Sequence, residues 1–195
     1  MELIGQIMRL QVQESSLKVG GTPRRWYDPT PIWAVPTLML NENGVVGRAE
    51  AGDIILDVHN TTHPASRSRA GSNGISVGFT SHYGVMRARF GDHLPDGIAG
   101  ENILVATERM FTEAEFAAGI CIETGDGATI DLEQVIIAEP CVEFSRYALR
   151  YPLDAPSDHA VTDALNFLRG GTRGFYATYR GAPATIAVGA RVSLL

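Results

Sequence analysis

Short apolar runs separated by turn residues dominate the pattern of hydrophobic and polar positions along the chain. Many of these runs carry Val, Ile, Tyr or Phe and are bounded by Gly, Pro, Asn or Asp, which is typical of strands. Many short strands at close spacing favour a sandwich or barrel over alternating strands and helices. The predicted strands lie at 3–12, 36–40, 53–59, 74–80, 101–106, 128–132, 134–140, 174–179, 184–189 and 191–195.

Helical patterns are few. Residues 81–89 are a weak candidate because Gly84 interrupts them. Residues 111–119 place Thr112 and Glu115 at the spacing of a capping box, with Gly119 as a stop signal. Residues 157–171 give the strongest pattern: an apolar stripe follows a cap at Ser157 or Asp158 and ends at a pair of glycines. Residues 18–32, rich in Pro and Gly, indicate a long loop or an arm over a neighbour.

Composition narrows the class of protein. The 195 residues, 45% hydrophobic and 19% charged, suit a single globular domain. No apolar run approaches the ~18 residues that a membrane span needs, and the first ten residues do not resemble a signal peptide. The net charge of −6 argues against nucleic acid as the main partner. Two cysteines 20 positions apart do not form a disulfide framework, so we expect reduced thiols and a cytoplasmic location.

Cys141 is the first candidate for chemistry. Pro140 ends the preceding strand, and the segment after it has the pattern of a short helical turn. A helix N-terminus favours a thiolate, which is both a nucleophile and a soft metal ligand. The alternative is a buried core cysteine, which is how we interpret Cys121 in its apolar surroundings.

Two polar stretches could bind a ligand. Gly97, Gly100, Glu101 and Asn102 form a glycine-rich turn before a strand, and the amide of Asn102 suits a ring edge. The stretch at 59–72 contains two histidines and two arginines, and Arg67 and Arg69 share a side if the segment is extended, which would suit a phosphate. His59 and His63 lack the spacing of a zinc site. Taken in isolation, the glycine-rich stretch is better explained as a solvated turn, and ordinary loop polarity is the alternative for the stretch at 59–72.

Together these stretches resemble the MOSC domain family, which occurs at the C-terminal end of molybdenum cofactor sulfurases and as stand-alone bacterial proteins. The resemblance covers roughly residues 35–195. Three segments carry it in the family's order: "GIAGENILV" at 97–105, "EPCVEFSRYAL" at 139–149, and the closing hairpin from Arg169 to Leu195. Two features depart from the family's pattern: the loop after His59 lacks paired glycines, and Ala138 occupies a position often held by arginine.

The resemblance implies a mainly β, closed-barrel fold with a few short helices, and it implies chemistry at Cys141. Cys141 would ligate molybdenum in a small cofactor-dependent reductase, or carry a persulfide for transfer to a metal centre. Glu101, Asn102 and His63 would line the cofactor site, and Arg67 and Arg69 would bind the pterin phosphate. A reductase would need an electron-donor protein, because the sequence contains no flavin or iron–sulfur motif.

A non-catalytic binding module is the remaining alternative, since a fold does not fix a function. The segment Arg24-Arg25-Trp26-Tyr27 has the residue types of an interface anchor. It could reach a second subunit, as in a homodimer, or cover the pocket, or be an ordered surface loop.

Overall fold

The centre of the molecule is a ring of seven strands. A computed structural model describes residues 1–21, 24–67, 74–153, 155 and 158–195. The ring runs in the order β14-β10-β11-β12-β8-β9-β1 and closes where β1 pairs with β14. Every neighbouring pair is antiparallel except β8 and β9. The mainly β, closed-barrel fold predicted from the sequence is therefore confirmed. The ring strands are β1 (Glu2–Gln13), β8 (Ile75–Phe79), β9 (Ile103–Ala106), β10 (Ile120–Glu123), β11 (Thr129–Ile137), β12 (Phe175–Thr178) and β14 (Arg191–Leu194).

The remaining strands lie outside the seven-strand ring. β4 (Ile32–Val35) pairs with the second half of β1. A separate four-strand sheet has the order β13-β5-β6-β7, and β2 (Lys18–Val19) pairs with β3 (Trp26–Tyr27). The bounds of the separate sheet are β5 (Thr37–Asn41), β6 (Gly44–Arg48), β7 (Ile54–Leu56) and β13 (Ala184–Ala187). Leu38, Leu40, Val45 and Ile186 of this sheet pack into the same apolar core as the barrel interior.

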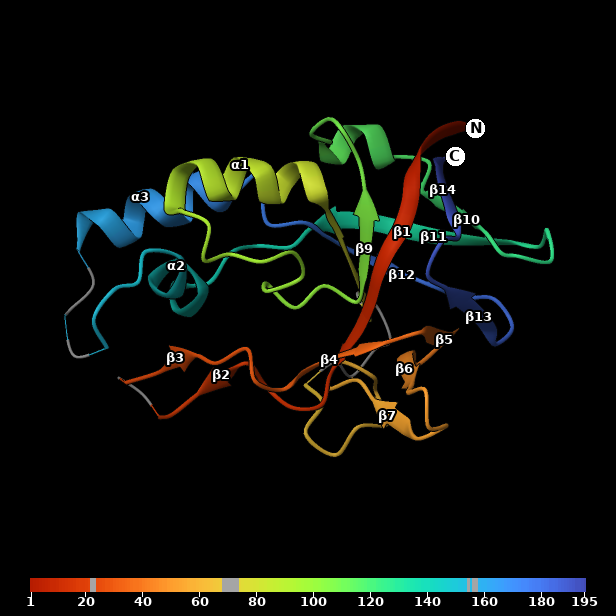
Figure 1. The fold of residues 1–195 in the computed structure, drawn as a ribbon, viewed down its shortest axis with the longest axis horizontal. Coiled ribbons are helices and arrows are strands. Elements are labelled where there is room, and N and C mark those ends of the chain that lie inside the picture. The colour runs from red at the N-terminus through yellow and green to blue at the C-terminus, as the bar shows by residue number, and fades with distance from the viewer. Residues whose placement is uncertain (22–23, 68–73, 154, 156–157) are drawn as a thin grey trace.

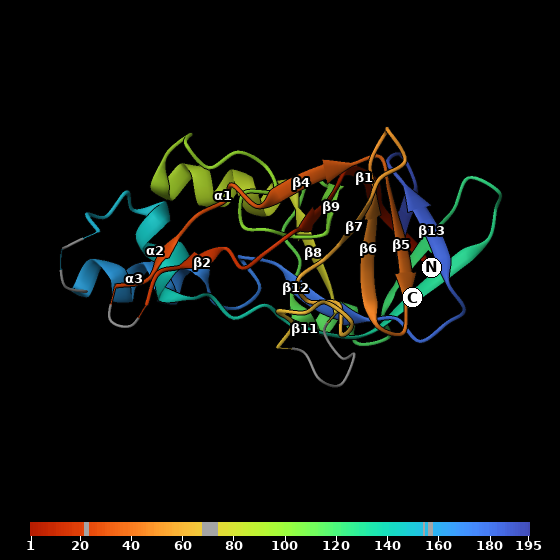
Figure 2. The ribbon, with the colours of Figure 1, turned by 90° about the horizontal axis from the view of Figure 1, so that it is seen from below.

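Three short helices gather at the other side of the molecule from the four-strand sheet, as both ribbon views show (Figure 1, Figure 2). They are α1 (Thr80–Phe90), α2 (Val142–Ala148) and α3 (His159–Leu168), and a 3₁₀ turn spans Glu113–Phe116. A second apolar cluster lies beneath them and includes Tyr27, Tyr83 and Phe144. None of the described helices is long and apolar enough to cross a membrane.

The helices predicted at 81–89 and 157–171 are confirmed as α1 and α3, whereas the segment 111–119 forms only the four-residue 3₁₀ turn. Thr112 and Glu115 form the predicted capping box. Asp158 caps α3 by accepting hydrogen bonds from the backbone N–H groups of Ala160 and Val161; Ser157, the other candidate, lies outside the described residues.

The strand predictions are confirmed in part. The two runs at 128–132 and 134–140 form one strand, β11, whose register shifts between Glu133 and Ile136. Gln134 occupies the shift with φ of 50°, a bulge that carries the strand past an interruption in its apolar pattern. The sequence analysis missed β4, β6 and β10, and the predicted loop at 18–32 contains β2 and β3.

Candidate functional site

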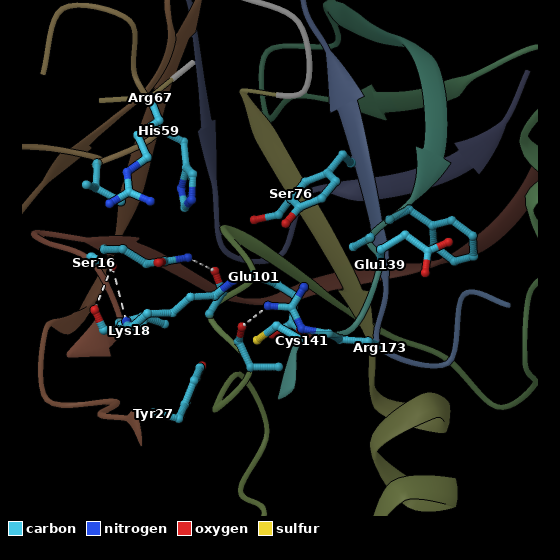
Figure 3. Close-up of a pocket in the computed structure, with 18 of the residues that line it drawn as sticks. Ser16, Lys18, Tyr27, His59, Arg67, Ser76, Glu101, Glu139, Cys141 and Arg173 are labelled. Atoms are coloured by element: carbon cyan, nitrogen blue, oxygen red, sulfur yellow. Dashed lines mark hydrogen bonds between the residues drawn. The ribbon is translucent and has the colours of Figure 1, made fainter. Parts of the chain in front are cut away.

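A cavity of about 270 Å³, the Cys141 cavity, opens at one end of the barrel. Its walls come from segments far apart in the sequence: the β2–β3 arm, the loop after β7, the turn before β9, and the segments flanking β11 and β12 (Figure 3). The charged and thiol side chains that line it are Lys18, Arg25, His59, Arg67, Glu101, Glu139, Cys141 and Arg173. Four of the eight are Lys or Arg, so this acidic protein has a basic cavity.

Cys141 lies at the junction between β11 and α2. β11 ends at Ile137, and Cys141 is the N-cap residue of α2, with its sulfur accepting a hydrogen bond from the backbone N–H of Phe144 at 3.5 Å. The thiol is half-buried and lines the cavity. The predicted placement of this thiol at a helix N-terminus is therefore confirmed. A helix N-terminus stabilises negative charge on the sulfur. Cys121, by contrast, is buried, as predicted.

Glu101 is a buried carboxylic acid at the cavity wall. The Tyr83 hydroxyl donates a hydrogen bond to Glu101 Oε2 at 2.7 Å, while Oε1 is buried and has no hydrogen-bond partner among the described residues. Burial raises the pKa of Glu101, and the positive charge of Arg173 opposes that rise. Gly78 makes room for the side chain, because a Cβ there would lie 2.8 Å from Glu101 Cγ. Gly100 is equally constrained, since φ of +89° and the contact with Gln13 both exclude a side chain.

Arg173 reaches the same wall from the turn before β12. Its guanidinium donates to the carbonyl of Ala99 at 2.8 Å and lies 5.6 Å from the centre of the Phe144 ring. Within the part of the chain that the structure describes, the buried Nε atom of Arg173 has no hydrogen-bond partner. In Figure 3 the guanidinium lies beside the Cys141 sulfur and the Glu101 side chain. The wall thus combines a cavity-lining thiol with a carboxylate and a guanidinium, each of which keeps one buried polar atom without a partner among the described residues.

The β2–β3 arm supplies further positive charge. Lys18 and Arg25 both lie near the Glu143 carboxylate of α2, with N–O distances of 4.0 and 3.5 Å. Tyr27 donates to the carbonyl of Ile98 at 2.7 Å and packs edge-on against Phe144 at 5.1 Å between ring centres. Arg25 and Tyr27 line the cavity, which is compatible with one of the roles considered for this segment.

The predicted ligand-binding residues divide into three groups. Glu101, Arg67 and Cys141 line the cavity together. Asn102 does not line it: the Asn102 side chain is buried and bonds to Ser76, Gln11 and Asp57. His63 also lies outside the lining, where its ring contacts the backbone of Glu14 and Ala65. Arg69 falls outside the described residues.

Two residues of this region, Arg173 and Asp57, were not predicted as site residues from the sequence. Arg173 stands between Gly171 and Gly174 immediately before an apolar strand, and that isolated charge is the signal that could have found it. Asp57 interrupts the apolar run 54–58 and is fully buried, so it needs hydrogen-bond donors close by.

Comparison with known proteins identifies neighbours by structure alone. No family model and no curated protein sequence matches the chain. Among solved structures, YuaD from Bacillus subtilis superposes with a TM-score of 0.58 at 14% identity, covering 97% of this chain and 94% of YuaD. YiiM from Geobacillus stearothermophilus gives 0.52 at 17% identity, covering 97% of this chain and 74% of YiiM. At such identities the likeness concerns the fold alone. The chain shares its closed-barrel fold with these proteins, and that fold agrees with the MOSC-like architecture expected from the sequence.

Proposed function

We propose that the Cys141 cavity binds a molybdenum–pterin cofactor, with Cys141 as the protein ligand to the metal, in a member of the MOSC domain family. The observation that carries this proposal is the half-buried Cys141 thiol, capping α2 inside a cavity that Lys and Arg side chains line. A thiolate is a soft ligand suited to such a metal.

The other residues of the cavity fit such a group. A pterin edge carries N–H groups beside ring nitrogens and a carbonyl, and would pair with a carboxylate and a guanidinium such as those of Glu101 and Arg173, which line the cavity. Lys18, Arg25 and Arg67 are available for the cofactor's phosphate. When bound, the molybdenum would supply two-electron oxygen-atom chemistry. The chain itself would bind and orient the group and limit water access, and a separate electron-carrier protein would provide the electrons.

Metal analysis tests this proposal. The wild-type protein, purified from a host that makes the cofactor, should contain molybdenum and release a fluorescent pterin on oxidation. Cys141→Ser should lose most of the metal, whereas Cys121→Ser, which changes the buried cysteine of β10, should retain it. Wild-type protein without molybdenum would count against the proposal, as would equal metal content in the two variants.

A sulfur carrier is the second candidate, and the hydrogen bond from Phe144 N–H to the Cys141 sulfur favours it. The Cys141 thiolate would attack the outer sulfur of a donor persulfide. The donor's S–S bond breaks, the donor leaves as a thiolate, and Cys141 gains one sulfur atom as a persulfide. Intact-mass analysis after incubation with a persulfide donor should then show one added sulfur in wild type and none in Cys141→Ser. If neither molybdenum nor added sulfur is found, a non-catalytic binding module is the remaining alternative.

A further inference from the structure

An aspartate–histidine pair borders the Cys141 cavity. The carboxylate of Asp57 is fully buried, and its Oδ1 contacts His59 twice: the backbone N–H at 2.9 Å and ring Nδ1 at 3.0 Å. The His59 side chain is 41% exposed and lines the cavity, on the rim beside Arg67 in Figure 3. The ring therefore has one nitrogen held by a buried acid while the rest of the side chain faces the open space.

The second oxygen of Asp57 is held just as firmly. Asp57 Oδ2 accepts from the backbone N–H of Gln13 at 2.8 Å and from Asn102 Nδ2 at 2.8 Å. Asn102 is itself fixed in orientation, because its Oδ1 accepts from the Ser76 backbone N–H and hydroxyl at 3.0 and 2.9 Å. The amide nitrogen of Asn102 must then point toward Asp57. A continuous chain of hydrogen bonds runs from Ser76 through Asn102 and Asp57 to His59.

This arrangement determines which nitrogen of the neutral His59 ring carries the hydrogen. A carboxylate accepts but does not donate, so Nδ1 of His59 must carry a hydrogen to bond with it. In the neutral ring Nε2 then has a free lone pair. A histidine whose second nitrogen is oriented by a buried carboxylate is the recurrent structure of a general acid–base group.

We propose that His59 is the acid–base residue of the Cys141 cavity, with Asp57 as its positioning residue and Asn102 as the residue that orients Asp57. The inference deepens the proposed reductase function and rests on it for the identity of the reaction. It assigns an oxygen-bearing substrate, X–O, to the space beside His59. The X–O bond breaks and two O–H bonds form, so that X–O, two electrons and two protons give X and water. The electron-carrier protein supplies the electrons, and His59 passes the protons from solvent to the departing oxygen.

The inference also gives Asn102 a role that its sequence position did not suggest. Asn102 was expected to contact the cofactor directly, yet its side chain is buried and each of its polar atoms is bonded within the protein. Its influence on the site would be indirect, through the orientation of Asp57 and the His59 ring.

The direct test is side-chain ¹⁵N NMR of the histidines in the full-length protein, with the His59 signals assigned by their loss in His59→Gln. We expect neutral His59 to be protonated at Nδ1. A neutral ring protonated at Nε2, or one exchanging rapidly between the two forms, would overturn the inference. This measurement needs neither metal nor substrate, so its failure is distinguishable from failure of the molybdenum proposal, which metal content decides.

Asp57→Asn provides the matched variant. The single oxygen of the new amide cannot serve all four donors that surround Asp57. If it stays with Gln13 N–H and Asn102, its NH₂ group opposes the backbone N–H of His59 and donates to His59 Nδ1, so the ring should change from the Nδ1–H to the Nε2–H form. We expect that change of tautomer in the spectrum. In molybdenum-loaded protein we expect kcat to fall about 100-fold or more in both Asp57→Asn and His59→Gln, with KM and metal content little changed. His159→Gln, at an exposed position of α3, is the control. An unchanged kcat in His59→Gln would contradict the acid–base role, and the wild-type spectrum remains decisive if Asp57→Asn fails to fold.

Discussion

At the scale of single residues, the main feature of the site is concentrated positive charge around one thiol. Lys18, Arg25, Arg67 and Arg173 line a cavity in a protein whose net charge is −6. Glu143 offsets part of the charge of Lys18 and Arg25. Burial raises the pKa of the Glu101 carboxyl, and the nearby Arg173 opposes that rise. The cavity should therefore attract anions although the protein as a whole repels them.

The reactivity of Cys141 should report this local field. Iodoacetate and iodoacetamide are similar in size but differ in charge, so the ratio of their alkylation rates at Cys141 measures the potential there. We expect the ratio to exceed that of a small free thiol, and Arg67→Gln to lower it about twofold to tenfold, as loss of one partly screened charge would. Peptide-level mass spectrometry separates Cys141 from buried Cys121.

Arg191→Gln supplies the control for this measurement. Arg191 is an exposed residue of β14 that pairs with Glu123 and does not line the cavity. Its substitution should leave the ratio unchanged. A ratio in wild type no higher than that of the free thiol would contradict the electrostatic description of the cavity.

At the scale of elements, side-chain caps fix where α3 and the 3₁₀ turn begin. Asp158 caps α3 with two hydrogen bonds, and Asp158→Ala should lower Tm by roughly 2–4 °C, a typical effect for a lost cap in a protein of this size. Asp158→Asn should restore most of the loss, because an asparagine oxygen caps equally well. Thermal unfolding followed by circular dichroism gives both values. An equal loss in the two variants would mean that the charge of Asp158, not its capping bond, is what stabilises α3.

Helices and several strands could be predicted because their signals are local. Each of these signals lies within its own element: Thr112 begins the 3₁₀ turn, and Asp158 directly precedes the apolar stripe of α3. β10 was missed, although three of its four residues are apolar, because nothing nearby in the sequence marks its pairing with β14. β11 was split for the opposite reason: its bulge at Gln134 interrupts the alternation that identifies one continuous strand.

The site was predictable only where its residues follow a local pattern. Pro140 and the helical turn identified Cys141, and the glycine turn identified Glu101. The placing of Arg173 and Asp57 depends instead on contacts with distant segments: Arg173 bonds to Ala99, 74 residues away, and Asp57 bonds to Gln13, 44 residues away. Such contacts form only when distant segments come together in the folded barrel, and the spacing of residues along the sequence does not encode them.

At the scale of the whole molecule, His82 connects segments that the barrel alone does not hold together. In α1, His82 Nδ1 contacts the Gly171 carbonyl at 3.0 Å, and its Nε2 accepts from the Phe111 backbone N–H at 3.0 Å. The ring must be neutral to accept that bond. Burial lowers the pKa of His82, while hydrogen bonds to Gly171 and Thr172 partly oppose the change.

Global stability should therefore depend on pH through His82. Below about pH 6.5 the unfolded chain binds a proton at this histidine, but the folded protein does so only at lower pH. The free energy of unfolding should fall as pH decreases through that window, by at most about 1.4 kcal/mol per pH unit. Urea unfolding at several pH values should show this slope in wild type and in His159→Gln. It should be reduced in His82→Gln, and an unchanged slope there would contradict the assignment.

Pairing between β1 and β14 has a consequence for synthesis. Residues 2–6 of β1 find their partners at 191–194, near the other end of the described sequence. A ribosome releases the first strand long before the last, so the ring stays open while most of the polypeptide already exists. During that interval the edges of β1 and β10 that β14 later occupies have unpaired amide and carbonyl groups, and such edges recruit other chains. Nascent protein should accordingly be most prone to aggregation just before β14 emerges.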